Sequence, residues 1–473
     1  MAVDAVVVGS GPNGLAAAIT LARAGLKVQV FEAKPTIGGG VRSMELTLPG
    51  FVHDVCSAIH PLTIASPFFR TIPFEQYGLE WVFPPAETAH PLDDQPSVLI
   101  DRSVEATAEG LDRDGAVYRQ LFGRLNARAD AIFSELLSPL NIPPKQLLAL
   151  AMAGLPGLFP ATTFARTLFR EERARAAFAG MAAHSILSLD QVATAAFGLM
   201  LQLSAHHVGW AFPRGGAQQI PNALAAYLRE LGGEILCDHP VRSLHDLPPA
   251  RVILLDTSPR TLEQIAGEEL RGWYRRLLRR YRYGAGVFKV DYALSEPIPW
   301  RDPQTARAAT VHIGGTLDEI VESERAVSLG AHPQRPFVLL AQHTLFDPTR
   351  APHGQHTAWA YCHVPNGSAV DMLDRIEAQI ERFAPGFRDI VLARSTRTTV
   401  ELEAYNPNYV GGDINSGAQD LFQQFTRPIP QFNPYATPIK GVYLCSSAVP
   451  PGGGVHGMSG YFAAMSALKS LRL

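Results

Sequence analysis

The sequence predicts an α/β fold in which a parallel sheet is assembled from separate stretches of the chain and joined to an α+β region with apolar helices. Four apolar residues at 5–8 predict a buried strand, and a glycine-rich turn leads from them into an alanine-rich helix over 15–25. A second strand over 27–32 completes a strand–helix–strand unit. Another apolar strand at 441–445, followed by a glycine-rich loop and a helix over 463–471, indicates that the two ends of the chain fold together.

The turn after the first strand has the spacing Gly-x-Gly-x-x-Gly. Its first glycine permits a tight turn, its second lets backbone approach a diphosphate, and its third allows the helix to pack closely on the strand. The helix N-terminus offers free N–H groups to the phosphates, and a carboxylate ending the second strand can accept both ribose hydroxyls. This context predicts a Rossmann-type dinucleotide site, with a purely structural glycine turn as the alternative. The expected contact residues are Gly9, Gly11, Pro12, Asn13, Gly14, Glu32 and Ala33.

The middle of the chain alternates between helical and strand-like patterns. Further helices are expected over 103–140, about 146–169, about 172–207, 218–231 and 370–383. Further strands are expected over 234–237, 251–255, 286–292 and 337–342. The stretch 146–165 is long enough to approach a membrane span, but its prolines and glycines predict a broken apolar segment instead.

Composition narrows the function classes. A chain of 473 residues is too long for one ordinary core, so at least two domains or a large insertion are expected. The 41 Lys and Arg nearly balance the 44 Asp and Glu, which argues against nucleic-acid binding. The 4 cysteines form no CxxC pair, so we predict neither a disulfide framework nor a metal site nor a dithiol centre. The early first strand leaves no room for a signal peptide, and we expect a cytoplasmic protein, with membrane association left open.

Two internal segments favour FAD over NAD. The segment 38–42, Gly-Gly-Gly-Val-Arg, resembles the continuation found in FAD proteins of the glutathione reductase and amine oxidase superfamily. The resemblance implies that Gly39 and Gly40 pass beside the pyrophosphate and ribityl chain and that Arg42 lies near the flavin; a flexible loop with a solvated arginine is the alternative. The segment 213–216 with its following helix resembles the middle FAD-domain segment of phytoene desaturases and amine oxidases, which implies contact between the backbone around Val241 and the adenine side.

The last strand supplies the other half of the resemblance. In the family this strand ends in Gly-Asp, which binds the ribityl chain and phosphate, whereas Ser446 and Ser447 stand there in this chain. Gly457, Met458 and Ser459 precede the last helix, whose backbone N–H groups can stabilise negative charge at the flavin N1/C2=O edge. The chain is similar over nearly its whole length to the phytoene-desaturase-like group. The segments 405–413 and 451–460 more narrowly resemble the subfamily named for a pyridine nucleotide-disulphide oxidoreductase domain.

From this resemblance we expect an FAD-binding domain made of residues 1–70, 205–280 and 435–473. A substrate domain with an apolar helical cap would use residues 71–204 and 281–434. The implied function is an FAD-dependent dehydrogenase or desaturase that transfers hydride from a hydrophobic substrate, such as an isoprenoid, to flavin N5, with quinone or oxygen as electron acceptor. The alternatives are a flavin-dependent double-bond isomerase, a flavin-bound interaction protein without turnover, and an amine oxidase. Peripheral membrane contact stays open, because the arginine-rich run 271–283 fits a solvated helix face or a membrane-surface patch.

Hydride transfer does not require a base from the protein, so the catalytic candidates are chosen by their positions in the motif segments. His456 lies in the last glycine-rich loop, where bracing the loop is an equal alternative. Tyr405 and Asp413 precede the final strand, although that segment is also ordinary turn chemistry. His184 lies in an apolar helical stretch, in which a histidine is usually a core residue. The other histidines in motif-like segments are His53, His60, His206 and His207.

Overall fold

The computed structural model describes residues 3–139 and 143–472. One of its two large sheets is wholly parallel, with the strand order β16-β10-β1-β2-β9. Its strands are β1 (Ala5–Val8), β2 (Val28–Phe31), β9 (Glu234–Leu236), β10 (Val252–Leu255) and β16 (Val442–Leu444). The predicted α/β architecture is confirmed. Each of the three stretches assigned to the FAD-binding domain supplies strands to this sheet, while the exact domain boundaries stay a prediction.

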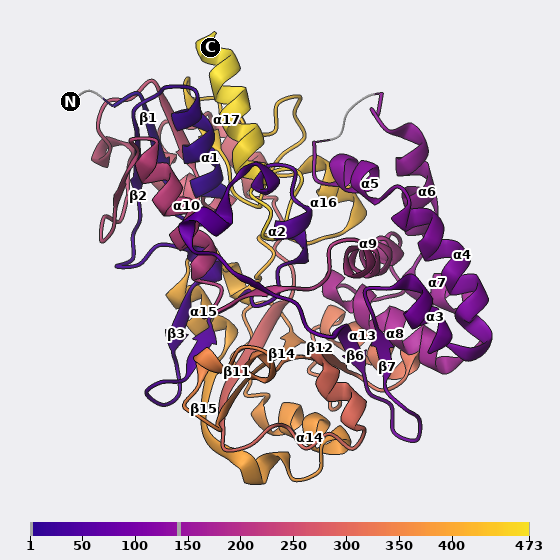
Figure 1. Cartoon of the computed structure of the whole chain (residues 1–473). Helices are drawn as coiled ribbons and strands as arrows, with labels where there is room; N and C mark the ends of the chain where they lie inside the picture. Colours follow the sequence, from indigo (N-terminus) through magenta and orange to yellow (C-terminus); the bar gives the residue numbers. More distant parts are fainter. Residues whose placement is uncertain (1–2, 140–142, 473) are drawn as a thin grey trace.

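Helices from both ends of the chain pack together on the parallel sheet (Figure 1). They are α1 (Pro12–Arg23) and α17 (Met458–Leu471), with α10 (Gln219–Glu230) beside α1. Both terminal helices begin earlier than the sequence predicted. Pro12 starts α1 directly in the glycine turn because proline suits the first helical position. The helix expected at 463 starts at Met458, after Gly457 in a left-handed conformation with φ 67°.

The second sheet is mixed and lies in the lower half of the molecule in Figure 1. Its strand order is β15-β11-β14-β13-β12-β6-β7. The strands are β6 (Ala86–His90), β7 (Val98–Ile100), β11 (Gly286–Leu294), β12 (Ala308–Ile313), β13 (Val338–Ala341), β14 (His356–Val364) and β15 (Val391–Arg397). Two short ribbons add β3 (Ser43–Glu45) with β4 (Val52–Asp54), and β5 (Trp81–Val82) with β8 (Phe212–Pro213). The helices outside the helical part are α2 (Pro61–Ala65), α11 (Pro259–Ala266), α12 (Gly272–Leu278), α13 (Leu317–Ser328), α14 (Leu373–Phe383), α15 (Thr399–Tyr405) and α16 (Leu421–Thr426).

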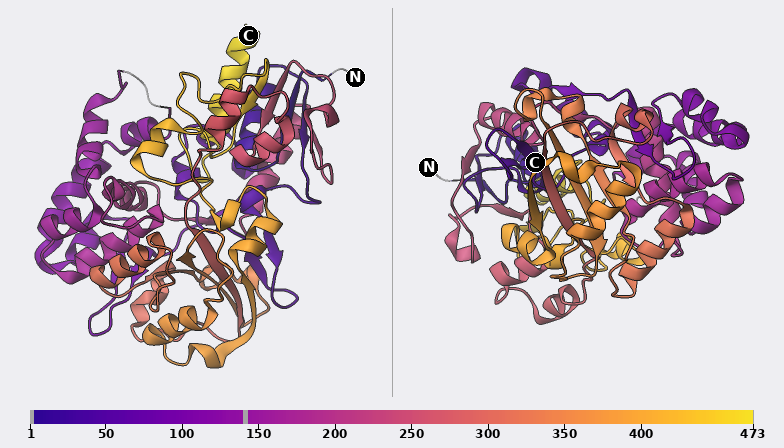
Figure 2. Two further views of the ribbon diagram at one scale, coloured as in Figure 1. Left: turned by 180° about the vertical axis from the view of Figure 1, so that it is seen from behind. Right: turned by 90° about the horizontal axis from the view of Figure 1, so that it is seen from below.

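A helical part stands beside both sheets, seen from behind and below in Figure 2. It contains α3 (Val104–Glu109), α4 (Gly115–Asn126), α5 (Ala129–Leu136), α6 (Leu147–Gly157), α7 (Ala161–Leu168), α8 (Glu172–Ala182) and α9 (Thr194–His207). The helix predicted over 103–140 is therefore three shorter helices, and its last position lies outside the described residues. Within the described chain, no single helix has the length and hydropathy of a membrane span; α6 and α7 reach them only together, bent by 94°.

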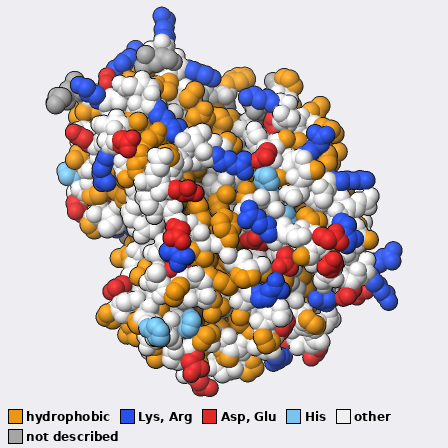
Figure 3. Space-filling model, in the orientation of Figure 1, with side chains coloured by type: hydrophobic (Ala, Val, Ile, Leu, Met, Phe, Trp, Pro, Cys, Tyr) orange, Lys and Arg blue, Asp and Glu red, His pale blue; other side chains and the backbone are white. Residues whose placement is uncertain are grey.

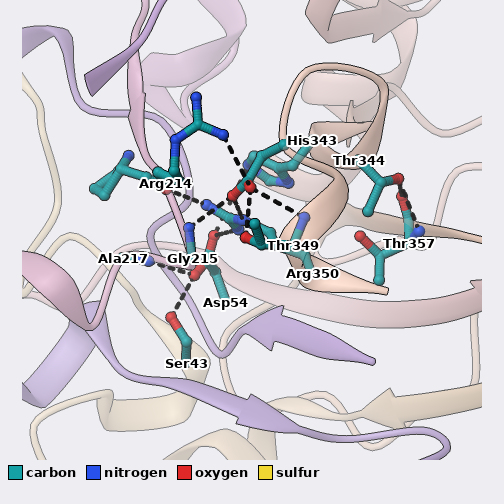
Figure 4. A network of polar contacts seen from close by, with 12 residues as sticks. Ser43, Asp54, Arg214, Gly215, Ala217, His343, Thr344, Thr349, Arg350 and Thr357 are labelled. Atoms are coloured by element: carbon teal, nitrogen blue, oxygen red, sulfur yellow. Dashed lines mark hydrogen bonds and ion pairs between the residues drawn. The ribbon is translucent and has the colours of Figure 1, made fainter. Parts of the chain in front are cut away.

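Opposite charges alternate over the surface drawn in Figure 3, and hydrophobic side chains gather in a band along its middle. Beneath the surface, a buried ion network ties the ribbon strands to the mixed-sheet part (Figure 4). Arg350 lies between Asp54 and Asp347, with N–O distances of 2.6 and 3.0 Å, and donates to the carbonyl oxygen of Pro213 at 2.7 Å. The Asp347 carboxylate in turn accepts the backbone N–H of Gly215 at 2.7 Å. This network holds the segment that leads into α10 against the hairpin of β3 and β4.

Candidate active site

A cavity of about 630 Å³ opens at the carboxyl ends of the parallel strands and extends to the mixed sheet and the helical part. Such a place, outside the ends of parallel strands, is where α/β folds bind nucleotides. The wall includes twelve of the residues predicted to hold the cofactor, namely Gly9, Gly11, Pro12, Asn13, Glu32, Ala33, Gly39, Gly40, Arg42, Val241, Ser446 and Ser447.

The first and third glycines of the turn have the tight turn and the close packing that their spacing predicts, while the approach of Gly11 to a diphosphate stays a prediction. Gly9 has φ 101°, a conformation that side chains rarely adopt. A Cβ on Gly14 would overlap the carbonyl oxygen of Gly9, so only glycine lets α1 begin this close to β1. The side-chain oxygen of Asn13 is buried in the wall without a hydrogen-bond partner among the described residues. The turn therefore presents backbone at close range and an unused polar atom to a ligand.

Glu32 and Arg42 form a buried ion pair in the cavity wall, and both side chains make further hydrogen bonds. The Glu32 carboxylate accepts the backbone N–H groups of Ser10 at 3.1 Å and Lys34 at 2.9 Å, and it pairs with Arg42 at 3.0 Å. Arg42 also donates to the carbonyl oxygen of Thr36 at 2.7 Å. Both side chains are less than one-tenth exposed. Arg42 thus lies beside the carboxylate expected to bind ribose, and its implied position near the flavin stays a prediction.

Replacing Glu32 with glutamine is expected to weaken FAD binding about 100-fold, since it removes a charged acceptor worth about 1.5–3 kcal/mol and leaves Arg42 without its partner. Titration of the flavin-free protein with FAD, followed by flavin fluorescence, measures the change. Glu234→Gln is the matched control, because that exposed carboxylate on β9 has one hydrogen bond within residues 3–139 and 143–472, from the Gln29 amide on the same sheet. Equal affinities for the two variants would contradict the role assigned to Glu32.

The end of the chain contributes less of the wall than predicted. Ser446 and Ser447 line the cavity, and Ser447 hydrogen-bonds Ser416 at 3.1 Å. Gly457, Met458 and Ser459, by contrast, are not part of the wall. The backbone N–H of Met458 already donates to His456 at 3.0 Å, and Ser459 donates to the carbonyl oxygen of Val449 at 3.2 Å. These residues serve the packing of α17 on α1, and Gly454 and Val455 face the cavity in their place.

Two of the four catalytic candidates are built into loops. The Asp413 carboxylate accepts three backbone N–H groups, from Gly284, Asn415 and Gly417, at 2.7–2.8 Å. Neither Asp413 nor His456 lines the cavity. Burial lowers the pKa of His456 to about 4, so its ring is neutral near pH 7 and accepts the Met458 N–H. The structure therefore favours the bracing alternative for His456 and the turn alternative for Asp413.

The other two candidates, Tyr405 and His184, do face the cavity. The Tyr405 hydroxyl is buried without a partner among the described residues, and its ring lies between the cations of Lys34, Arg42 and Arg397. Tyr405 consequently belongs to the Glu32 end of the wall. His184 lies at the opposite end, where its Nε2 is 3.0 Å from Nε2 of His312, and burial lowers its pKa to about 3.

His60 is a wall residue that the sequence argument did not select. Both of its ring nitrogens are buried without a partner in the described chain, and burial lowers its pKa to about 4. The sequence showed it only as one of several histidines in motif-like segments, directly before Pro61 at the start of α2. Thr310 on β12 and Trp359 on β14 likewise line the cavity with an unpartnered hydroxyl and indole N–H. Unused buried donors and acceptors are rare in folded proteins, so these atoms indicate contact with a ligand or water.

Charge is distributed unevenly along the cavity. Among its described wall residues, the carboxylates and permanent cations are all in the parallel-sheet part: Glu32, Lys34, Arg42, Arg242 and Asp256. The rest of the wall, formed by the mixed sheet, the helical part and the start of α2, carries mainly aromatic and aliphatic side chains, with the Thr310 hydroxyl and the neutral imidazoles of His60 and His184. One end is thus suited to a charged, polar ligand and the other to a neutral, apolar one.

A glycine turn at a helix N-terminus, a carboxylate after the second strand and a long cavity between two sheets define a dinucleotide-binding flavoprotein, and the unpartnered Asn13 and Tyr405 atoms fit such a cofactor. The model of the flavin containing amine oxidoreductase family matches residues 13–465, so the chain belongs to this family. It is an oxidoreductase with FAD as its cofactor.

The chain is also similar to known proteins in sequence and in fold. It is 26% identical to pyridine nucleotide-disulfide oxidoreductase domain-containing protein 2 of Rattus norvegicus, over 99% of this chain and 94% of the relative. It is 22% identical to one of the subunits of limonene dehydrogenase from Castellaniella defragrans, over 99% and 95% of the two chains. The fold resembles that of putrescine oxidase in the structure of the wild type bound to putrescine, with a TM-score of 0.64, 15% identity and full coverage of both chains.

Proposed function

We propose that this protein is an FAD-dependent dehydrogenase or desaturase of the phytoene-desaturase-like type, acting on a neutral hydrophobic substrate such as an isoprenoid. The observation that carries the proposal is the absence of charged side chains from the described cavity wall beyond the parallel-sheet part. A protonated amine would lose its hydration there without gaining a counter-ion, which is costly, whereas a hydrocarbon loses nothing. The similarity to a limonene dehydrogenase supports the same substrate class.

The apolar end of the cavity would bind the substrate and keep water away from it. Leu62, Leu201, Leu339 and Trp210 surround the substrate and exclude water, which favours a hydride transfer over side reactions. Bound FAD supplies the hydride acceptor at N5, and quinone or oxygen reoxidises it. His60 is neutral near pH 7 and neither ring nitrogen has a partner among the described residues, so it can accept the second hydrogen of the substrate, which leaves as a proton.

The test is anaerobic reduction of the bound flavin by a panel of substrates, followed by the mass of the product. Limonene and a longer linear isoprenoid are expected to bleach the flavin and to lose two hydrogens, whereas putrescine and benzylamine are not. Bleaching by the amines alone would refute the proposal in favour of an amine oxidase. A product of unchanged mass would indicate double-bond isomerisation, and a flavin that no compound reduces would favour an interaction protein without turnover.

Replacing His60 with phenylalanine keeps an aromatic ring of similar size but removes the proton acceptor. We expect the variant to retain FAD and to reduce its flavin about 100-fold more slowly with the active isoprenoid, within the usual range for a lost general base. His245→Phe is the control, because its side chain is 86% exposed. An unchanged reduction rate in the His60 variant would exclude it as the acceptor. In the wild type, the rate should not vary between pH 6 and 8 through His60, whose pKa of about 4 keeps it neutral there.

Exposed leucines of α6 support a further part of the proposal, contact with a membrane surface. Leu147, Leu148 and Leu155 are 59–67% exposed, although hydrophobic side chains of this size are usually buried. A hydrophobic substrate would then reach the protein without crossing water. Cytoplasmic location stays part of the same proposal.

A further inference from the structure

Asp256 is a carboxyl group in the place where the cofactor's phosphates are expected. It directly follows β10, and its backbone N–H donates to the carbonyl oxygen of Val8 at 2.8 Å, which places it opposite Gly9. Its side-chain Oδ2 accepts the backbone N–H of Gly14 at 2.9 Å. A Cβ on Gly11 would come within 2.7 Å of the same oxygen. The carboxyl group therefore lies against the glycine turn at the N-terminus of α1, and it lines the cavity.

No positive side chain offsets this group. Among the described residues, no Lys, Arg or His forms an ion pair with Asp256, and Arg42, a cation of the same wall, pairs with Glu32. The titratable groups that face Asp256 are Glu32 after β2 and the Cys445 thiol after β16. Burial and the Glu32 charge raise the pKa of Asp256 to about 7, although the Gly14 N–H opposes them. The protonation of the carboxyl group thus changes near neutral pH.

We infer that FAD binds to the form of the protein in which Asp256 is protonated, so that cofactor binding takes up one proton. The doubly charged diphosphate and an ionised carboxylate would compete for the same helix N-terminus and repel each other at close range. A neutral Asp256 removes the repulsion and keeps an oxygen free to accept the Gly14 N–H. The inference rests on the FAD site and is independent of the proposed substrate.

Proton linkage gives the expected size of the effect. Below the pKa of the free protein, near pH 7, the FAD affinity should be constant, and above it the dissociation constant should rise about tenfold per pH unit. Asp256→Asn keeps the shape and the acceptor oxygen while removing the charge. This variant should bind FAD about tenfold more tightly than the wild type at pH 8 and show no pH dependence between pH 6 and 8. Asp4→Asn, at the other end of β1, is the control and should behave as the wild type does.

Titration of the flavin-free protein with FAD measures these affinities. Calorimetry of the wild type at pH 8, in buffers of different ionisation enthalpy, counts the protons directly and does not depend on any variant folding. We expect uptake of close to one proton. No uptake, or a pH dependence that persists in Asp256→Asn, would overturn the inference while leaving FAD binding intact. Failure of the wild type to bind FAD at any pH would instead remove the flavoprotein assignment on which the proposed function rests.

Discussion

Replacing Gly460 with alanine is expected to abolish FAD binding and to lower the free energy of unfolding by about 3 kcal/mol or more. Gly460 lies in the first turn of α17, where this helix crosses α1. A Cβ there would overlap the carbonyl oxygen of Asn13, which is backbone and cannot rotate away. The clash must push α17 off α1, at an overpacking cost at the upper end of the usual range. Because Asn13 belongs to the cofactor turn, the same shift distorts the cavity wall.

Gly123→Ala provides the matched control for this substitution. Gly123 also lies inside a helix, α4, but a Cβ there meets no atom within 4 Å. Alanine at that position should stabilise the helix by up to about 1 kcal/mol, because glycine is a poor helix former. Urea unfolding and the ratio of flavin to protein absorbance compare the two variants. If Gly460→Ala retained its flavin and unfolded at the wild-type urea concentration, the tight crossing of the terminal helices would be wrong.

The parts of the fold that could be predicted from the sequence are those set by local patterns. The spacing of Gly9, Gly11 and Gly14 and the carboxylate at Glu32 each follow from neighbouring residues, and the structure places all of them as the pattern requires. The contact between the two ends of the chain was predicted from the family resemblance and from the apolar strand before α17. Helix starts were placed too late, because glycines at 11 and 457 suggest loop but serve as N-terminal caps.

The site beyond the glycine turn depends on contacts that no local pattern encodes. Asp256 is a candidate because it contacts Gly14, which lies 242 residues away in sequence. His60 is a candidate because its ring nitrogens have no partner among the described residues and it lines a wall shared by several elements. The backbone N–H of Met458, which the resemblance assigned to the flavin edge, already donates to His456, and no local sequence pattern indicates that bond. Asp413 was a candidate because its segment precedes the last strand, where related enzymes place residues that face the flavin, yet its carboxylate accepts three backbone N–H groups.

The buried ion network of Figure 4 is another long-range feature, and breaking it should have the second large effect. Arg350→Met keeps the length of the side chain but removes the cation that lies between the buried Asp54 and Asp347, and Asp347 keeps the more distant Arg214, at 3.8 Å. Removing one partner of a buried pair costs about 3–5 kcal/mol, and here two carboxylates lose it. We expect the free energy of unfolding to fall by about 5 kcal/mol at neutral pH. Because Asp54 also accepts the N–H of Ala217 at 2.7 Å, next to the segment that leads into α10, FAD affinity should fall too.

The pH dependence separates this explanation from simple loss of packing. Burial alone would raise the pKa of Asp54, but Arg350, His343 and hydrogen bonds from Ser43 and Ala217 lower it below its ordinary 3.8. In the wild type Asp54 therefore contributes stability that is present above about pH 4 and is lost as the pH falls further. Without Arg350 the buried carboxyl should have a raised pKa, so protonation in acid removes the cost of its burial. The difference in stability between variant and wild type should therefore shrink below neutral pH.

Arg335→Met, whose side chain is 71% exposed, should change stability by less than about 1 kcal/mol at every pH. An Arg350 variant that matched this control, or one whose deficit stayed constant from pH 7 to pH 4, would show that packing and not charge holds this part of the molecule together.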